Sequence, residues 1–355
     1  MRYRHPAAMA ILLASPAWDV PTGRMFIERF DAMAGSPLPG ALSLPAFDGG
    51  SGKDRLSTLI LRSRLRSSVT FPGEAPSILY DAVLDGFAAV VTRSSKGLDI
   101  SVVMQDGIHV TTMTESDAAI EHTHVTETGL RTTSDEVSRR NRRSLIHDLE
   151  GDSEAVGLPM EPMPLADPFA PLDIRIFLHD EIRTSEARSI HASYVAWWLR
   201  DMEANILPSD LSIDVSYMQS ISGISDQAYG MPSSLGTWLT AVDRYVAARG
   251  IRRTWKNKYV LITRRPPSEG KLGRAIPAYG VAMASLSAPY SVVAHELGHL
   301  FGAEHVDAEW RWDWWPCRTN MMSDDSVLFA NCREYSAANI ARIQQYVDLK
   351  GYLPD

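Results

Sequence analysis

The sequence predicts a mixed α/β (α+β) fold preceded by a smaller β-rich unit. Segments with helical and with strand periodicity alternate through the second half of the chain. Short alternating stretches separated by turn residues occupy much of the first half, and a polar, Pro-rich stretch lies between the two. With 355 residues and 45% hydrophobic content, the chain can bury a substantial core and is long enough for about two domains.

The first segment is typical of a secretory signal peptide. Residues 1–17 combine a basic start, a short apolar stretch and small residues near a cleavage point. An ordinary N-terminal tail is the alternative, because the apolar stretch is short and Pro16 stands beside that point. Residues 18–53 are rich in Pro and Gly with few periodic stretches, so we expect loops or weak structure there.

A small antiparallel β unit is expected between residues 57 and 114. Alternating β-branched and polar residues, bounded by turn residues, indicate its strands. The expected strands lie at 69–71, 87–92, 98–103 and 108–112.

A polar stretch then separates this unit from the second domain. It contains four arginines within residues 139–143, and like charges keep such a segment extended and open to proteases. We interpret it as a cleavage region cut by a processing protease, with a solvated charge run as the alternative. The sequence thus predicts a propeptide-like region at 18–170 and a second domain at 171–355.

The second domain alternates strands and helices. Its expected order is strand, helix, strand, helix, strand, strand and helix, followed by one more helix near the C-terminus. The expected elements are strand 174–178, helix 185–203, strand 211–217, helix 235–249, strand 259–263, strand 280–285, a helix beginning near Pro289 and helix 337–347.

The motif HExxHxxGxxH at 295–305 carries the chemistry. His295 and His299 are four residues apart, so on a helix they share one face and can bind one zinc ion. Glu296 lies where its carboxylate can act as general base on a zinc-bound water. Gly302 can adopt φ > 0, which lets the chain leave the helix and return His305 as the third ligand. Three histidines and a water make a catalytic zinc site rather than a structural one.

This extended motif resembles that of the metzincin zinc peptidases. The resemblance implies a catalytic domain with a mixed, mostly parallel sheet and a zinc-site helix, preceded by a β-rich propeptide. It also implies a methionine turn, which matches Asn320-Met321-Met322-Ser323, with Met322 chosen as the residue under the zinc ion. The fourth strand, 280–285, would then be an antiparallel edge strand that pairs with an extended substrate; an ordinary buried strand is the alternative.

Within the metzincins, the layout is similar to the adamalysin or reprolysin branch. Cys317 precedes the methionine turn, and Cys332 follows it and leads into the last helix. In an oxidising compartment the two could form a disulfide; two buried thiols are the alternative if the chain is cytosolic. The branch usually has Asp where Val306 stands. Both cysteines follow His305, so a propeptide thiol cannot hold the enzyme latent.

Composition excludes other classes. The net charge of −8 argues against a nucleic-acid partner, and no apolar run is long enough to span a membrane. His122 and His124 form a pair that could contact a metal ion, but no third ligand is apparent and surface placement is the alternative. His109 looks isolated.

The sequence therefore predicts a secreted or periplasmic zinc metalloendopeptidase that acts on protein or peptide substrates with one catalytic Zn²⁺. The alternatives are a zinc-loaded but inactive binding module, or a zinc hydrolase of a non-peptide amide or ester.

Overall fold

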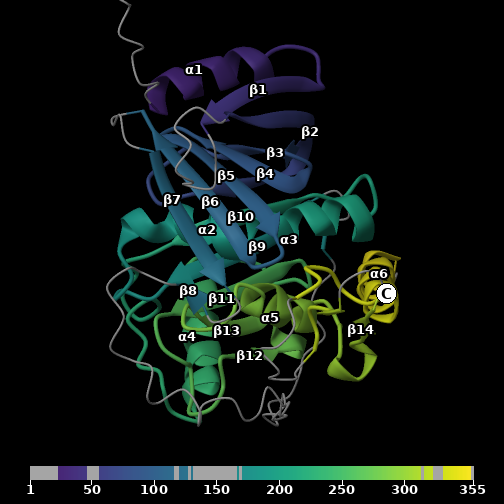
Figure 1. Cartoon of the computed structure of the whole chain (residues 1–355). Helices are drawn as coiled ribbons and strands as arrows, with labels where there is room; N and C mark the ends of the chain where they lie inside the picture. Colours follow the sequence, from purple (N-terminus) through teal and green to yellow (C-terminus); the bar gives the residue numbers. More distant parts are fainter. Residues whose placement is uncertain are drawn as a thin grey trace, which may run out of the picture.

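A single large sheet organises the molecule, with helices on both faces (Figure 1). In the residues that the computed structural model describes, thirteen strands belong to this sheet. The mixed α/β fold class is confirmed. None of the described helices has the length and apolarity that crossing a membrane requires. The described residues are 23–45, 56–115, 120–126, 129–130, 166–167, 170–312, 316–322 and 331–352.

The first half of the chain forms the antiparallel part of the sheet. Neighbouring strands from β1 to β8 pair antiparallel, as expected for the β-rich unit. Strands β1, β3, β7 and β8 were not expected. The strands are β1 (Gly40–Pro45), β2 (Leu56–Thr70), β3 (Ser77–Leu84), β4 (Phe87–Ser94), β5 (Gly97–Met104), β6 (Gly107–Thr114), β7 (Ile120–Thr126) and β8 (Gly129–Leu130).

The expectation of loops or weak structure at 18–53 is wrong where the structure describes this segment. Helix α1 (Gly23–Ala34) precedes β1 and buries Phe26, Ile27 and Phe30 against the antiparallel strands. Three apolar residues at this spacing line one face of a helix, and burying them outweighs the frequent Pro and Gly nearby.

The second half of the chain forms the mostly parallel part. The strands run in the order β12, β13, β11, β9 and β10, and all pair parallel except β12 with β13. Segment 280–285 is therefore not an antiparallel edge strand. It contains β13, a fully buried interior strand that pairs parallel with β11 and antiparallel with β12. The strands are β9 (Leu172–Leu178), β10 (Ile213–Met218), β11 (Asn257–Thr263), β12 (Gly273–Ile276) and β13 (Val281–Ser285).

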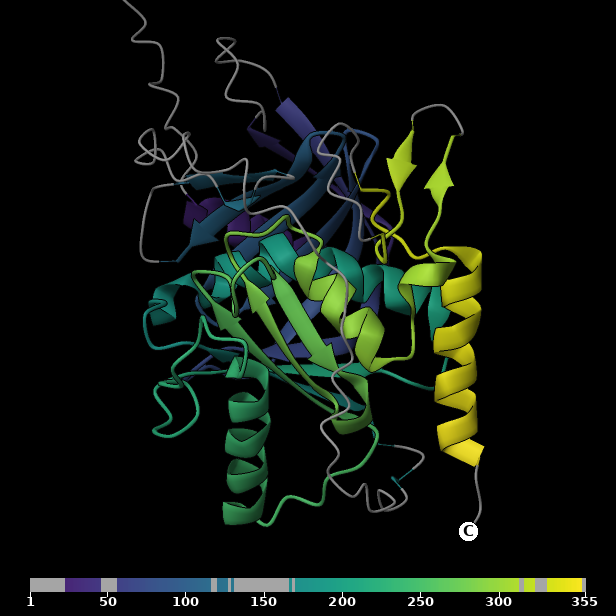
Figure 2. The same cartoon turned by 90° about the horizontal axis from the view of Figure 1, so that it is seen from below.

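Helices of the second half cover both faces. Helices α2 (Ala187–Tyr194), α3 (Ala196–Asp201) and α5 (Val292–Leu300) share one core with the sheet, whereas α4 (Ser234–Ala248) packs on the other face. Figure 2 shows α4 and α6 (Ala337–Tyr352) to either side of α5. The expected helix 185–203 is interrupted at Val195, whose φ of −125° breaks the helical geometry, and ends in a π-helical turn, Met202–Ile206.

Strand pairing joins the two halves. β10 pairs parallel with β2, with Val215 opposite Val69, so the sheet continues from one half into the other. The apolar core between the sheet and helices α2, α3 and α5 also includes residues from both halves. Arg188 on α2 lies 2.8 Å from Asp99 on β5, and this ion pair is almost completely buried. The domain boundary at about 170 stays a prediction, because the residues around it lie mostly outside the described part of the chain.

Candidate metal centre and active site

Three imidazole rings converge at the C-terminal end of α5. His295 and His299 lie one helical turn apart on this helix, and His305 lies in the short 3₁₀ helix that follows, His305–Asp307. The Nε2 atom of His305 is 2.9 Å from that of His295 and 3.0 Å from that of His299. The structure therefore brings together the three histidines that the motif predicts as ligands, at separations close to those of ligands around one ion.

Backbone carbonyls fix the orientation of two of these rings. Nδ1 of His295 lies 2.8 Å from the carbonyl oxygen of Asn320, and Nδ1 of His299 lies 3.1 Å from that of Ala303. A carbonyl only accepts, so each Nδ1 carries the proton and each Nε2 presents a lone pair. Burial, followed by the neighbouring imidazoles, lowers the pKa of His299 to about 4 and that of His295 well below its ordinary value. Neutral lone pairs facing one another fit a bound cation, and this donor set suits zinc.

Gly302 lets the chain leave α5 as the motif requires. Its φ is +86°, a conformation that costs glycine little. The amide of Gly302 donates to the carbonyl of His299, and the amide of Ala303 donates to that of Gly298. This pair of bonds is the Schellman motif, which ends the helix and turns the chain back toward His305.

Helix α6 anchors the segment that carries His305. The side chain of Asn339 accepts from the amide of Glu304 at 2.8 Å and donates to its carbonyl at 3.1 Å, and Ser336 donates to the carbonyl of Asp307. Asn339 is completely buried. The sequence alone does not mark Asn339 as part of the site, because only its spatial proximity to Glu304 shows this role.

Glu296 belongs to α5, and its side chain points toward the edge strand β12. It is 2% exposed, and its carboxylate packs so closely on Gly273 of β12 that a Cβ there would overlap it. One carboxylate oxygen has no hydrogen-bond partner among the described residues. Burial raises the pKa of Glu296 to about 8, and the positive charge of Arg274 partly opposes this. A buried carboxyl group with a raised pKa beside a metal centre is typical of a proton-transfer residue.

The methionine turn lies beneath α5, but burial favours Met321 over the expected Met322. Met321 is completely buried, and its sulfur would lie 2.6 Å from a Cβ at Gly298. Met322 is only partly buried and lines a cavity of about 40 Å³ beside His295. The strand-like alternation around a turn can place either residue inside, so the sequence alone could not decide between them.

Tyr335 completes the support under the helix. It is completely buried, accepts from the indole of Trp198 at 2.9 Å and donates to the carbonyl of Ala294 at 2.5 Å. Its ring carbon Cε1 would lie 2.7 Å from a Cβ at Gly298. No sequence signal marked Tyr335 or Gly298 as part of the site.

A disulfide closes the methionine-turn segment. Cys317 and Cys332 are bonded, and their Cα atoms lie 5.1 Å apart. Arg318, next to Cys317, lines the cavity beside His295. Of the tryptophans near this segment, Trp312 is 68% exposed, and Trp314 and Trp315 lie outside the described residues.

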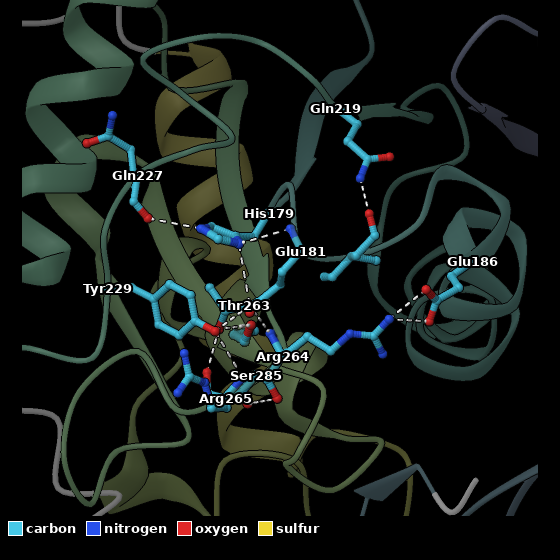
Figure 3. Close-up of polar contacts among 12 residues, drawn as sticks. His179, Glu181, Glu186, Gln219, Gln227, Tyr229, Thr263, Arg264, Arg265 and Ser285 are labelled. Carbon is cyan, nitrogen blue, oxygen red and sulfur yellow. Dashed lines mark hydrogen bonds and ion pairs between the residues drawn. The ribbon is translucent and has the colours of Figure 1, made fainter.

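A polar cluster lies at the carboxyl ends of β9, β11 and β13, and its side chains form hydrogen bonds and ion pairs with one another (Figure 3). One amino group of the Arg264 guanidinium donates to both carboxylate oxygens of Glu186, at 2.6 Å and 2.7 Å. Glu181 accepts from the amide of Arg264 at 3.0 Å and from the hydroxyl of Tyr229. Burial alone would raise the pKa of Glu181, but these hydrogen bonds hold it below its ordinary value. The cluster ties together the segments that follow these three strands.

Comparison with known proteins supports the fold. No family model matches this chain, and no curated protein sequence matches it either. The crystal structure of metalloproteinase-II from Bacteroides fragilis has a similar fold, with a TM-score of 0.59 and 14% sequence identity. The match covers 92% of this chain and 96% of the other, so it includes both halves of the sheet. The chain thus has a metalloproteinase-like fold.

Proposed function

We propose that this chain is a secreted zinc-dependent endopeptidase. The observation that carries the proposal is the convergence of three Nε2 atoms, from His295, His299 and His305, with the buried Glu296 next to His295 on α5. The metalloproteinase-like fold supports it.

The site residues divide into ligands and a base. The three histidines would hold the ion, and a bound zinc ion would supply an acidified water and polarise the scissile carbonyl. Glu296 takes the proton of the attacking water and delivers it to the leaving amine. Its buried position against Gly273 keeps the carboxyl group in one orientation and holds bulk water away from it.

We assign substrate pairing to β12 rather than to segment 280–285. β12 is the terminal strand of the described sheet, and it carries Gly273, which contacts the carboxylate of Glu296. An extended peptide that adds to this strand would pass Glu296 and the three imidazoles. This assignment replaces the one that the metzincin resemblance implied.

Secretion and processing belong to the same proposal. The Cys317–Cys332 disulfide supports export to an oxidising compartment. The disulfide around the methionine turn also supports the adamalysin-like branch, although Val306 departs from that branch. The signal peptide at 1–17 and the cleavage region at 139–143 lie outside the described residues and stay predictions.

Separating base from ligand tests the mechanism. Glu296→Gln should bind as much zinc as the wild-type protein and lower casein turnover at least about 100-fold, because the base is lost and the ligands remain. His299→Ala should lose the metal ion. Glu304→Gln is the matched control: its carboxylate is half exposed and pairs only with Arg342 at 3.1 Å among its described contacts, so activity should change little.

The outcomes also separate the alternatives. An active Glu296→Gln protein would refute the general-base role. A wild-type protein that holds zinc but cleaves neither casein nor a peptide library would support the inactive binding module instead. Cleavage of aryl esters or small amides without any peptide cleavage would support the second alternative, a zinc hydrolase of a non-peptide amide or ester.

A further inference from the structure

A second cluster of metal-ligand side chains lies on the antiparallel part of the sheet. Asp106 lies in the turn between β5 and β6, His109 lies on β6 and His124 on β7. The register places His109 directly opposite His124. Nε2 of His109 is 2.9 Å from one carboxylate oxygen of Asp106, and Nε2 of His124 is 3.4 Å from the other. One ligand atom from each residue lies within 4.8 Å of the other two.

The backbone at Gly107 makes this approach possible. Its φ is +144°, and a Cβ at this position would lie 3.1 Å from Nε2 of His124 and would overlap the carbonyl oxygen of Val125. A side chain at Gly107 would therefore push the turn away from β7. Glycine here lets the carboxylate of Asp106 approach Nε2 of His124.

We propose that Asp106, His109 and His124 bind a second divalent transition-metal ion, of the Zn²⁺, Ni²⁺ or Co²⁺ class. Imidazole nitrogens favour these ions, and one carboxylate completes a three-ligand set with positions left for water. The site shares no residue with the centre at His295. In the sequence, His124 pairs with His122 and no third ligand is apparent; pairing of β6 with β7 brings His109 and Asp106 to His124 instead.

The ring arrangement sets one requirement for binding. The two rings are stacked, with centroids 4.0 Å apart and planes 20° from parallel. A metal ion lies near the plane of each ring that binds it, so at least one ring must rotate about its Cβ–Cγ bond. The side chains of His109 and His124 are 23% and 36% exposed, so solvent borders both rings and leaves room for this rotation.

His122 provides a matched control. It lies two residues from His124 on the same strand and face, and its Nδ1 lies 3.0 Å from the hydroxyl of Thr111 rather than at the carboxylate of Asp106. Its replacement removes an exposed histidine from the same strand without removing a proposed ligand.

The test counts metal ions in the full-length protein. The chain is stripped with EDTA and titrated with Zn²⁺ by calorimetry, and the bound metal is measured after gel filtration. The wild-type protein should bind two equivalents. His109→Asn/His124→Asn should bind one and keep its caseinolytic activity, Asp106→Asn should weaken one equivalent at least about tenfold, and His122→Asn should bind two.

Three results would overturn the proposal. The first is one equivalent in the wild-type protein at a tenfold excess of Zn²⁺. The second is an unchanged stoichiometry in the double variant, with unchanged affinity in Asp106→Asn. The third is loss of an equivalent in His122→Asn. Asp106 is 61% exposed in a turn, so its variant should fold and gives a readout even if the double variant does not.

Discussion

Replacing Gly298 by alanine should weaken the site although it adds only one methyl group. In a helix, alanine is favoured over glycine by about 1 kcal/mol. Here the new Cβ would lie 2.6 Å from the sulfur of Met321 and 2.7 Å from Cε1 of Tyr335. The methionine side chain can move, but hydrogen bonds to Trp198 and to the carbonyl of Ala294 hold the tyrosine ring in place.

The net effect follows from these two opposing contributions. Overpacking costs about 1–3 kcal/mol, so after the gain in helix propensity we expect up to about 2 kcal/mol of lost stability. The displacement is next to His299, so the affinity for zinc should fall as well. Urea unfolding and zinc competition with a chelator measure the two effects.

Gly236 in α4 is the matched control. It is also a helical glycine, but no atom outside its own helix and its chain neighbours lies within 4 Å of an added Cβ. Gly236→Ala should therefore leave zinc affinity unchanged and raise stability, by up to about 1 kcal/mol. Equal effects of Gly298→Ala and Gly236→Ala would refute the argument from packing.

Three further predictions concern pH, the disulfide and proteolysis. Burial lowers the pKa of His191 to about 3 from its ordinary value of 6.5, so the stability that its neutral form gives is complete above pH 6.5 and is lost as the pH falls toward 3. At pH 5 this loss is about 2 kcal/mol. His191→Leu should therefore lose less unfolding free energy between pH 7 and pH 5 than the wild-type protein does, and an equal loss in the two proteins would contradict the prediction. Replacing Cys317 and Cys332 by serine should cost about 3 kcal/mol of stability, because their bond closes a 15-residue separation. Unfolding with and without reductant measures this, and two alkylatable thiols in the native protein would contradict it. Limited trypsin treatment should cut near Arg143, and N-terminal sequencing of the fragments checks this; cuts confined to the described strands would contradict it.

The sequence predicted the elements whose evidence is local. The motif at 295–305 places its residues on one helix turn and one tight turn, so their spacing alone specifies the histidine cluster. Strands such as β9 and β11 were predicted because their apolar runs are continuous. Helix α1 was missed because its short apolar face is surrounded by Pro and Gly.

The features that were missed depend on contacts between distant residues. β12 has only four residues, three of them partly buried, so it lacks a strong strand pattern. The pairing of Val69 with Val215 joins residues far apart in the sequence, and neither segment indicates its partner. The hydrogen bonds of Asn339 with Glu304 and of Tyr335 with the carbonyl of Ala294 likewise join residues far apart in the sequence. Local periodicity carries no information on such contacts.

Because the sheet is continuous, cleavage of the chain and departure of the N-terminal fragment are two separate events. A cut within 139–143 breaks no pairing between β2 and β10, because neither strand contains these residues. Departure of the N-terminal fragment would in addition leave the backbone groups of β10 without their partners on β2 and expose the shared apolar core to water. A nicked molecule would therefore persist as a two-chain protein, in which the fragment acts as a bound subunit until the sheet itself opens.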